Sequence, residues 1–94
     1  MVDDTSLLAA LNHPLRREIL AKMGITEAPL SPRELSEDLG EPLSNVSYHV
    51  RVLNQFEIIG LARTRPVRGT MQHFYRADPE ILAIAWVRSM VGLA

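Results

Sequence analysis

The apolar positions in the first quarter of the chain repeat at helical spacing. The stretch SLLAAL predicts a short first helix, and LRREILAKM predicts a second one with Pro14 in its first turn. Gly24 is expected to close the second helix, because glycine commonly ends helices. We therefore expect two N-terminal helices within residues 5–23.

A pattern typical of a helix-turn-helix follows. In SPRELSEDLG, Ser31 is the expected N-cap, Glu34 completes a capping box and Gly40 ends the helix. Only EPL then separates this helix from Ser44, the next candidate N-cap. A connection so short makes two helices cross at a steep angle, so we place a helix-turn-helix at residues 31–56.

The second helix of this pair has two contrasting faces. Val46, Val50 and Leu53 form an apolar stripe, with His49 and Phe56 at its margin. The opposite side carries no carboxylate and presents Ser44, Ser47, Tyr48, Arg51 and Gln55. Ser, Asn and Tyr lower helix propensity, whereas hydroxyls, amides and guanidinium groups suit the phosphates and base edges of a DNA major groove. The alternative is an exposed helix face that binds nothing.

Two strand-like runs follow, IIGLARTR and TMQHFYRA, joined by PVRG, whose proline and glycine are turn formers. They predict a β-hairpin, or wing, over residues 58–77. Arg63 and Arg65 would share one face by the period of a strand, with Arg68 at the tip. These arginines could reach DNA phosphates or a narrow minor groove, or they could only protect the hairpin edge from aggregation.

The last segment, DPEILAIAWVRSMVGLA, predicts a helix over residues 79–92 that is apolar nearly all round. A small domain has too little core to bury every side of such a helix, so we expect a second copy of the chain to cover it. The alternative is a helix packed wholly against its own domain. The candidate dimer-interface residues are Leu7, Leu8, Leu11, Ile84, Trp86, Val87, Met90 and Val91.

Charge is distributed unevenly along the chain. The 94 residues fit one domain, 1–94, with a net charge of −1. Residues 1–42 carry a net charge of −4, whereas residues 43–77 hold five arginines against one acid, Glu57, and carry +4. This regional charge indicates a phosphate-binding surface, although an arginine-rich solvated hairpin would have the same composition.

Other features exclude several classes of protein. The absence of cysteine excludes disulfides, thiolate metal sites and a thiol nucleophile, and fits a reducing cytoplasm. SLLAAL is too short for the apolar core of a signal peptide, and the run ILAIAWV falls far short of the ~20 residues that span a bilayer. We expect a soluble, cytoplasmic protein with no membrane partner.

Residues that would carry catalysis or bind a metal are not grouped in the sequence. HExxH, GxSxG and glycine-rich phosphate loops do not occur, and Ser47 and His49 point to different sides of one helix. His13, His49 and His73 fall on three separate elements, whereas a first-row metal needs three or four convergent ligands. We expect no enzyme activity, no metal and no cofactor, and interpret His49 as a packed or capping imidazole.

Three blocks in order resemble the ArsR-type winged helix-turn-helix transcriptional regulators of prokaryotes. They are LNHPLRREIL, then LSPRELSEDLG with LSNVSYHVRVL, and finally RGTMQHFYRADPEIL. The resemblance implies a homodimer that binds a pseudo-palindromic operator, usually represses, and releases DNA when an effector binds. It implies DNA-reading roles for Ser44, Asn45, Ser47, Tyr48 and Arg51.

The chain departs from this family at several positions. His13 stands where the family often has Asp, and Glu57 where a glycine usually closes the recognition helix, so local caps are expected to differ. The cysteines or Asp/His clusters of metal-sensing members are missing.

The expected fold is mainly α-helical with a small β-hairpin, a winged helix-turn-helix that dimerises through its terminal helices. The expected function is sequence-specific binding of double-stranded DNA as a transcriptional repressor. Two alternatives stay open: a winged-helix module that binds another protein, and a regulator controlled by a non-metal small molecule of unknown identity. A protein-binding face would more often carry an apolar anchor than Ser, Tyr and Arg, which favours DNA.

Overall fold

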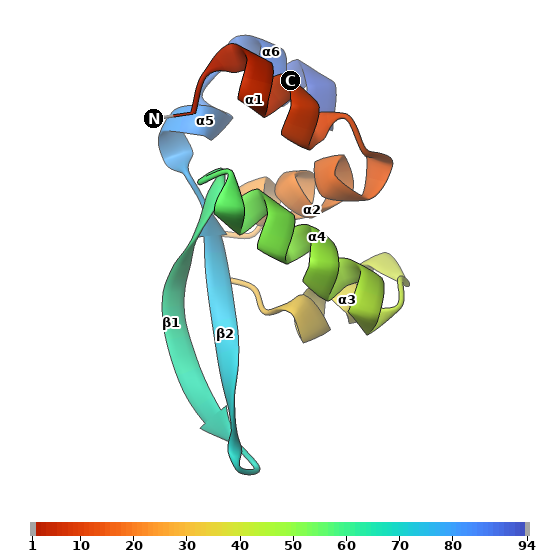
Figure 1. Ribbon diagram of the computed structural model, residues 1–94, viewed down its shortest axis with the longest axis vertical. Helices are drawn as coiled ribbons and strands as arrows, with labels where there is room; N and C mark the ends of the chain where they lie inside the picture. The colour runs from red at the N-terminus through yellow and green to blue at the C-terminus, as the bar shows by residue number, and fades with distance from the viewer. Residues whose placement is uncertain (1, 94) are drawn as a thin grey trace.

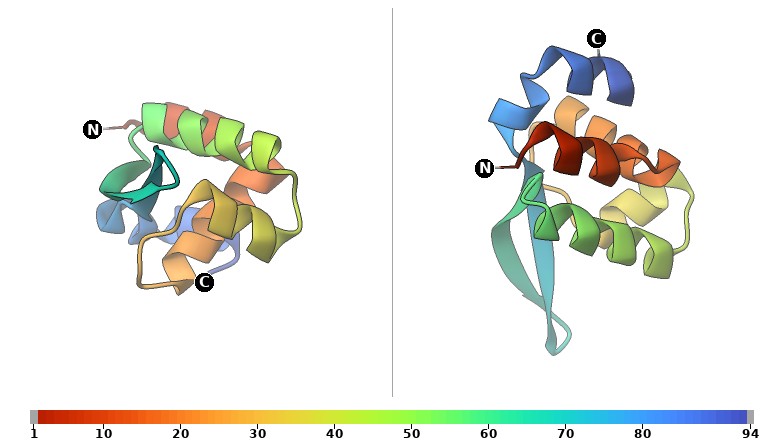
Figure 2. Two further views of the ribbon diagram at one scale, coloured as in Figure 1. Left: turned by 90° about the horizontal axis from the view of Figure 1, so that it is seen from below. Right: turned by 45° about the horizontal axis from the view of Figure 1, so that its top comes forward.

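The computed structural model describes residues 2–93, which form helices packed around one core and a long two-stranded hairpin (Figure 1). The elements in chain order are α1 (Asp4–Leu11), α2 (Pro14–Ile25), α3 (Pro32–Leu39), α4 (Leu43–Gln55), β1 (Ile59–Val67), β2 (Thr70–Ala77), α5 (Pro79–Leu82) and α6 (Ala85–Val91). Helices α1, α5 and α6 gather at one end, and the hairpin tip forms the other (Figures 1 and 2). The architecture is a winged helix-turn-helix, as the sequence predicts.

The two N-terminal helices are capped by short side chains. Asp3 accepts a hydrogen bond from the backbone N–H of Ser6 (2.7 Å), and Nδ1 of His13 accepts one from that of Leu15 (3.1 Å). His13 thus takes the capping role for which Asp is more usual.

The prediction that Gly24 ends α2 is wrong, because the helix continues through it to Ile25. A Cβ atom at Gly24 would lie 2.6 Å from Cδ1 of Leu93, so glycine leaves room there for the C-terminal segment. Packing between distant parts of the chain, not a helix end, explains this residue.

The helix-turn-helix forms with one change at its second helix. The capping box is confirmed: Ser31 Oγ accepts from the Glu34 N–H (3.2 Å), and Glu34 accepts from the Ser31 N–H (2.9 Å). Gly40 ends α3 in the left-handed conformation, at φ 65°. The prediction of Ser44 as N-cap is wrong, because Pro42 occupies that position and its carbonyl accepts the first helical bond, from Val46 N–H at 3.1 Å.

The hairpin is antiparallel and ends in a two-residue turn. Val67 pairs with Thr70, and the two residues between them, Arg68 and Gly69, have φ values of 47° and 80°. Two positive φ angles give the turn the twist that suits a hairpin. The turn is therefore shorter than the predicted PVRG, and Pro66 lies within β1.

The C-terminal segment forms two short helices where one helix over residues 79–92 was predicted. Ile84 is extended, with φ −71° and ψ 123°, and separates α5 from α6. In one straight helix Ile81 and Val87 would point about 120° apart, at about 100° per residue. The break lets both side chains enter the core, where they are buried.

The core joins every helix to the base of the hairpin. The predicted stripe of α4 is confirmed, since Val46, Val50 and Leu53 are buried. The buried apolar residues around them include Leu11, Ile19, Leu20, Leu35, Ile58, Ile59, Phe74 and Ala77. No helix within residues 2–93 is long and apolar enough to cross a bilayer.

This core also contains four of the eight residues predicted for a dimer interface. Leu7, Leu11, Val87 and Val91 are buried within the single chain, so they have no surface to offer a partner. Leu8 is 52% exposed, and Ile84, Trp86 and Met90 are partly buried. The helical pattern alone did not separate the buried residues from the exposed ones, because it does not show which sides of these helices pack against the chain's own core.

Candidate nucleic-acid interface

Helix α4 presents the polar face that the sequence predicts. Burial of its apolar stripe turns Ser44, Asn45, Tyr48 and Arg51 to the surface, and Tyr48 is 54% exposed. Ser47 is half-buried at the edge of this face. The early start of α4 places Ser44 and Asn45 in its first turn, where their side chains are free to meet a ligand.

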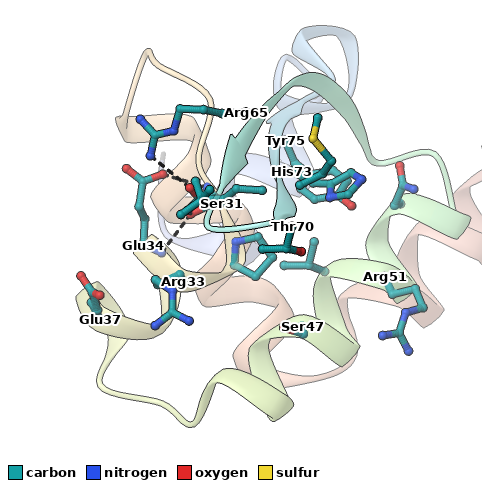
Figure 3. A pocket seen from close by; sticks show the side chains of 16 residues that line it. Ser31, Arg33, Glu34, Glu37, Ser47, Arg51, Arg65, Thr70, His73 and Tyr75 are labelled. Atoms are coloured by element: carbon teal, nitrogen blue, oxygen red, sulfur yellow. Dashed lines mark hydrogen bonds between the residues drawn. The ribbon is translucent and has the colours of Figure 1, made fainter.

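A groove of about 650 Å³ separates the hairpin from the helix-turn-helix (Figure 3). Ser47 and Arg51 line it from α4, Thr70 lines it from the hairpin, and Arg65 lies at the hairpin side as well. The structure therefore brings the predicted DNA-reading helix and a predicted wing arginine to the same groove.

Sequence reasoning missed some residues of this groove. Arg33, exposed in the first turn of α3, adds a third guanidinium, and Gln72 and His73 contribute polar groups from β2. Arg33 could have been found from the helical period, because it lies away from Leu35, the buried residue of α3.

The arginines of the hairpin are held by an aromatic ring and an amide. The guanidinium carbons of Arg63 and Arg65 lie 3.9 Å and 5.3 Å from the ring centroid of Phe74, within the range of cation–π attraction. Both arginines thus share one face, as predicted. Arg65 also donates to Oε1 of Gln72 (3.0 Å), whereas Arg68 lies at the tip.

These arginines form no ion pair within the described residues, although Glu34 and Glu37 of α3 also line the groove. Within residues 2–93 the ion pair that forms is Lys22 with Asp38, at 3.9 Å, and no arginine of the hairpin or of α4 takes part in one. Unpaired guanidinium groups on one face attract phosphate and raise the rate at which a polyanion associates.

Two histidines from separate elements meet beside α4. The rings of His13 and His49 lie 4.2 Å apart, and Arg16 Nη1 lies 3.1 Å from His49 Nδ1. Arginine can only donate, so this nitrogen of His49 is an acceptor and the ring is neutral. His49 is therefore packed, as predicted. In the part of the chain that the structure describes, no three His, Cys, Asp or Glu side chains gather as metal ligands.

Burial, followed by the neighbouring charges of His13 and Arg16, lowers the pKa of His49 below its ordinary value of 6.5. The unfolded chain, in which this pKa is normal, therefore takes up more protons on acidification. The free energy of unfolding is expected to be highest above pH 6.5, the ordinary pKa, and to fall as the pH drops below that value.

Urea unfolding at pH values from 5 to 8 tests this expectation, and those values bracket roughly the histidine range. His49→Gln, which keeps an acceptor for Arg16, should flatten the pH dependence, whereas the matched change His73→Gln on the exposed hairpin should not. Equal pH profiles for wild type and His49→Gln would contradict the assignment.

The fold and the groove define a winged helix-turn-helix protein. A family model described as a helix-turn-helix domain matches residues 11–58, just over half of the chain. The chain therefore belongs to this family of helix-turn-helix domains.

Among solved structures, the chain is similar to reduced HlyU from Vibrio cholerae N16961, with 26% sequence identity and a TM-score of 0.62. The similarity covers 95% of this chain and 81% of that chain. No curated protein matches the sequence significantly.

Proposed function

We propose that this chain is a transcription regulator of the ArsR type that binds double-stranded DNA as a homodimer on a pseudo-palindromic operator and represses transcription. Membership of the helix-turn-helix family and similarity to HlyU support a DNA-binding regulator. One observation carries the proposal: the acid-free face of α4 and Arg65 of the hairpin, which forms no ion pair within residues 2–93, border one groove. The site of action would be the cytoplasm, where DNA is accessible.

In this proposal the two parts of the groove have different tasks. Helix α4 enters the major groove, where Ser44, Asn45, Ser47, Tyr48 and Arg51 contact base edges and phosphates. The hairpin follows the neighbouring backbone, with Arg63, Arg65 and Arg68 against phosphates or in the minor groove. No cofactor is needed for either task.

The dimer would form at the end of the molecule opposite the hairpin tip, where α1, α5 and α6 gather (Figure 2). Leu8, Ile84, Trp86 and Met90 retain exposed apolar surface there. In this dimer each copy would be a single winged domain over residues 1–94 that presents one α4. Residues 79–92 would form the dimerisation segment, and a two-fold axis would relate the two copies.

Replacing Arg65 and Arg68 with alanine tests the role of the hairpin. The slope of log K against log salt should become flatter by up to about two units, because each lost phosphate contact releases roughly one counterion fewer. Fluorescence anisotropy with a labelled duplex at several salt concentrations measures this slope.

Arg76→Ala is the matched control, because Arg76 lies near the base of the same strand pair, outside the groove. Its slope should stay close to that of wild type. If the double variant keeps both the slope and the affinity of wild type, the hairpin does not bind DNA.

A further inference from the structure

Gln72 forms two hydrogen bonds, one to Arg65 within the hairpin and one that links the hairpin to the start of the helix-turn-helix. Its Oε1 accepts from Arg65 Nη2 and its Nε2 donates to Ser31 Oγ, both at 3.0 Å. Ser31 is the N-cap of α3 and is completely buried. The exposed Arg65 is thus connected, through the amide of Gln72, to the buried Ser31.

This link is the outermost hydrogen bond between the hairpin and the rest of the chain within residues 2–93. Closer to the base, Leu30 and Tyr75 exchange two backbone hydrogen bonds of 2.9 Å and 2.8 Å. Beyond Gln72, the strands pair with each other alone up to the turn. Gln72 is therefore the last point toward the tip at which a hydrogen bond joins the described hairpin to α3.

The chemistry of an amide suits this place. Ser31 Oγ already accepts from the Glu34 N–H, and Gln72 can donate to it and accept from Arg65 at the same time. A carboxylate would accept from Arg65 but would add a negative charge to a surface that is proposed to meet phosphate. An apolar side chain would hold neither partner.

We infer that Gln72 is a positioning residue, which holds Arg65 in place through the Ser31 N-cap of α3 for contact with the DNA backbone. This inference rests on the proposed function. An arginine held in place loses less side-chain freedom when it binds phosphate, so loss of the link should weaken DNA binding by about 3- to 10-fold. Gln72 need not touch the DNA to have this effect.

A double-mutant cycle on affinity for a fluorescein-labelled duplex tests the inference. Gln72→Met, which keeps length but removes the amide, should weaken binding in the wild-type background and have no effect when Arg65 is already alanine. Equal losses in both backgrounds would overturn the inference, because Gln72 would then act without Arg65. Unchanged affinity of Gln72→Met would overturn it too.

Asn12→Met is the control, since Asn12 is exposed at the end of α1, lies outside the groove and forms no side-chain hydrogen bond within the described chain. It should bind as wild type does. Urea unfolding of all variants separates positioning from stability: a loss of affinity that merely follows a loss of folded protein contradicts the inference.

A measurement without DNA keeps this inference separate from the proposed function. Nitrogen-15 relaxation of the guanidinium Nε–H should show increased motion of Arg65 in Gln72→Met, with Arg63 unchanged on its Phe74 ring. Unaltered motion of Arg65 would overturn the link itself. Failure of the wild-type protein to bind any duplex would instead overturn the proposed function. The binding assay on the wild-type protein shows this before any substitution is made.

Discussion

Trp86→Glu is expected to separate the proposed dimer into monomers that bind a full operator about 100-fold or more weakly, because the linked second half-site is lost. Trp86 lies on α6 and is partly buried in the single chain. In a dimer seam an unpaired carboxylate would be desolvated at a cost of several kcal/mol. Sedimentation velocity and anisotropy on the same samples measure both effects.

Leu8→Glu is the sharper variant, because Leu8 is 52% exposed and a charge there does little to the single chain. It should keep the unfolding midpoint and still yield monomers. Leu61→Glu makes the same change on the hairpin, at 53% exposure, and should leave the oligomeric state unchanged. A folded Leu8→Glu dimer that binds the operator normally would show that the seam lies elsewhere.

Arg51→Ala is expected to weaken operator binding by about 1 to 3 kcal/mol if the guanidinium donates to a guanine edge. The preference at one base pair of each half-site should then relax, which competition with single-substitution operators would reveal. An equal loss of affinity for all DNA sequences would indicate that Arg51 contacts a phosphate. Arg76→Ala, the same change at an exposed arginine outside the groove, serves as control.

If Arg51→Ala changes neither affinity nor preference, this residue does not belong to the site. Such a result would place the contacts at the first turn of α4, where Ser44 and Asn45 are exposed.

Local signals in the sequence were sufficient for much of the fold. The capping box of Ser31 and Glu34 and the left-handed Gly40 act over a few residues, so they mark the bounds of α3 directly. The alternation of the hairpin and the apolar stripe of α4 likewise depend on short periods, and they predicted correctly which side of α4 is exposed. These features can be predicted without knowing which helices and strands pack against one another.

The errors arise where distant segments decide. A glycine stands inside α2 at position 24 because a Cβ there would meet Leu93, and the C-terminal segment breaks at Ile84 so that Ile81 and Val87 both enter one core. The dimer candidates divided into a fully buried set and a set that keeps some exposed surface for the same reason. No local pattern contains this information.

The same limit applies to the site. The bond between Gln72 and Ser31 joins residues 41 apart in the sequence, and that between Arg16 and His49 joins residues 33 apart. Both contacts depend on how the hairpin and α2 pack against the helix-turn-helix. Sequence reasoning found most of the charged groups but not the side chains that hold them.

Selection of bound sites from a pool of random duplex DNA tests the central claim most directly. A two-fold dimer that places one α4 in each of two successive major grooves should enrich a near-palindrome whose half-sites are centred about 34 Å, or one helical turn, apart. Point changes in each half-site should weaken binding about equally. Recovery of random sequence without enrichment, from protein that is folded and dimeric, would contradict the assignment of this chain as a sequence-specific regulator.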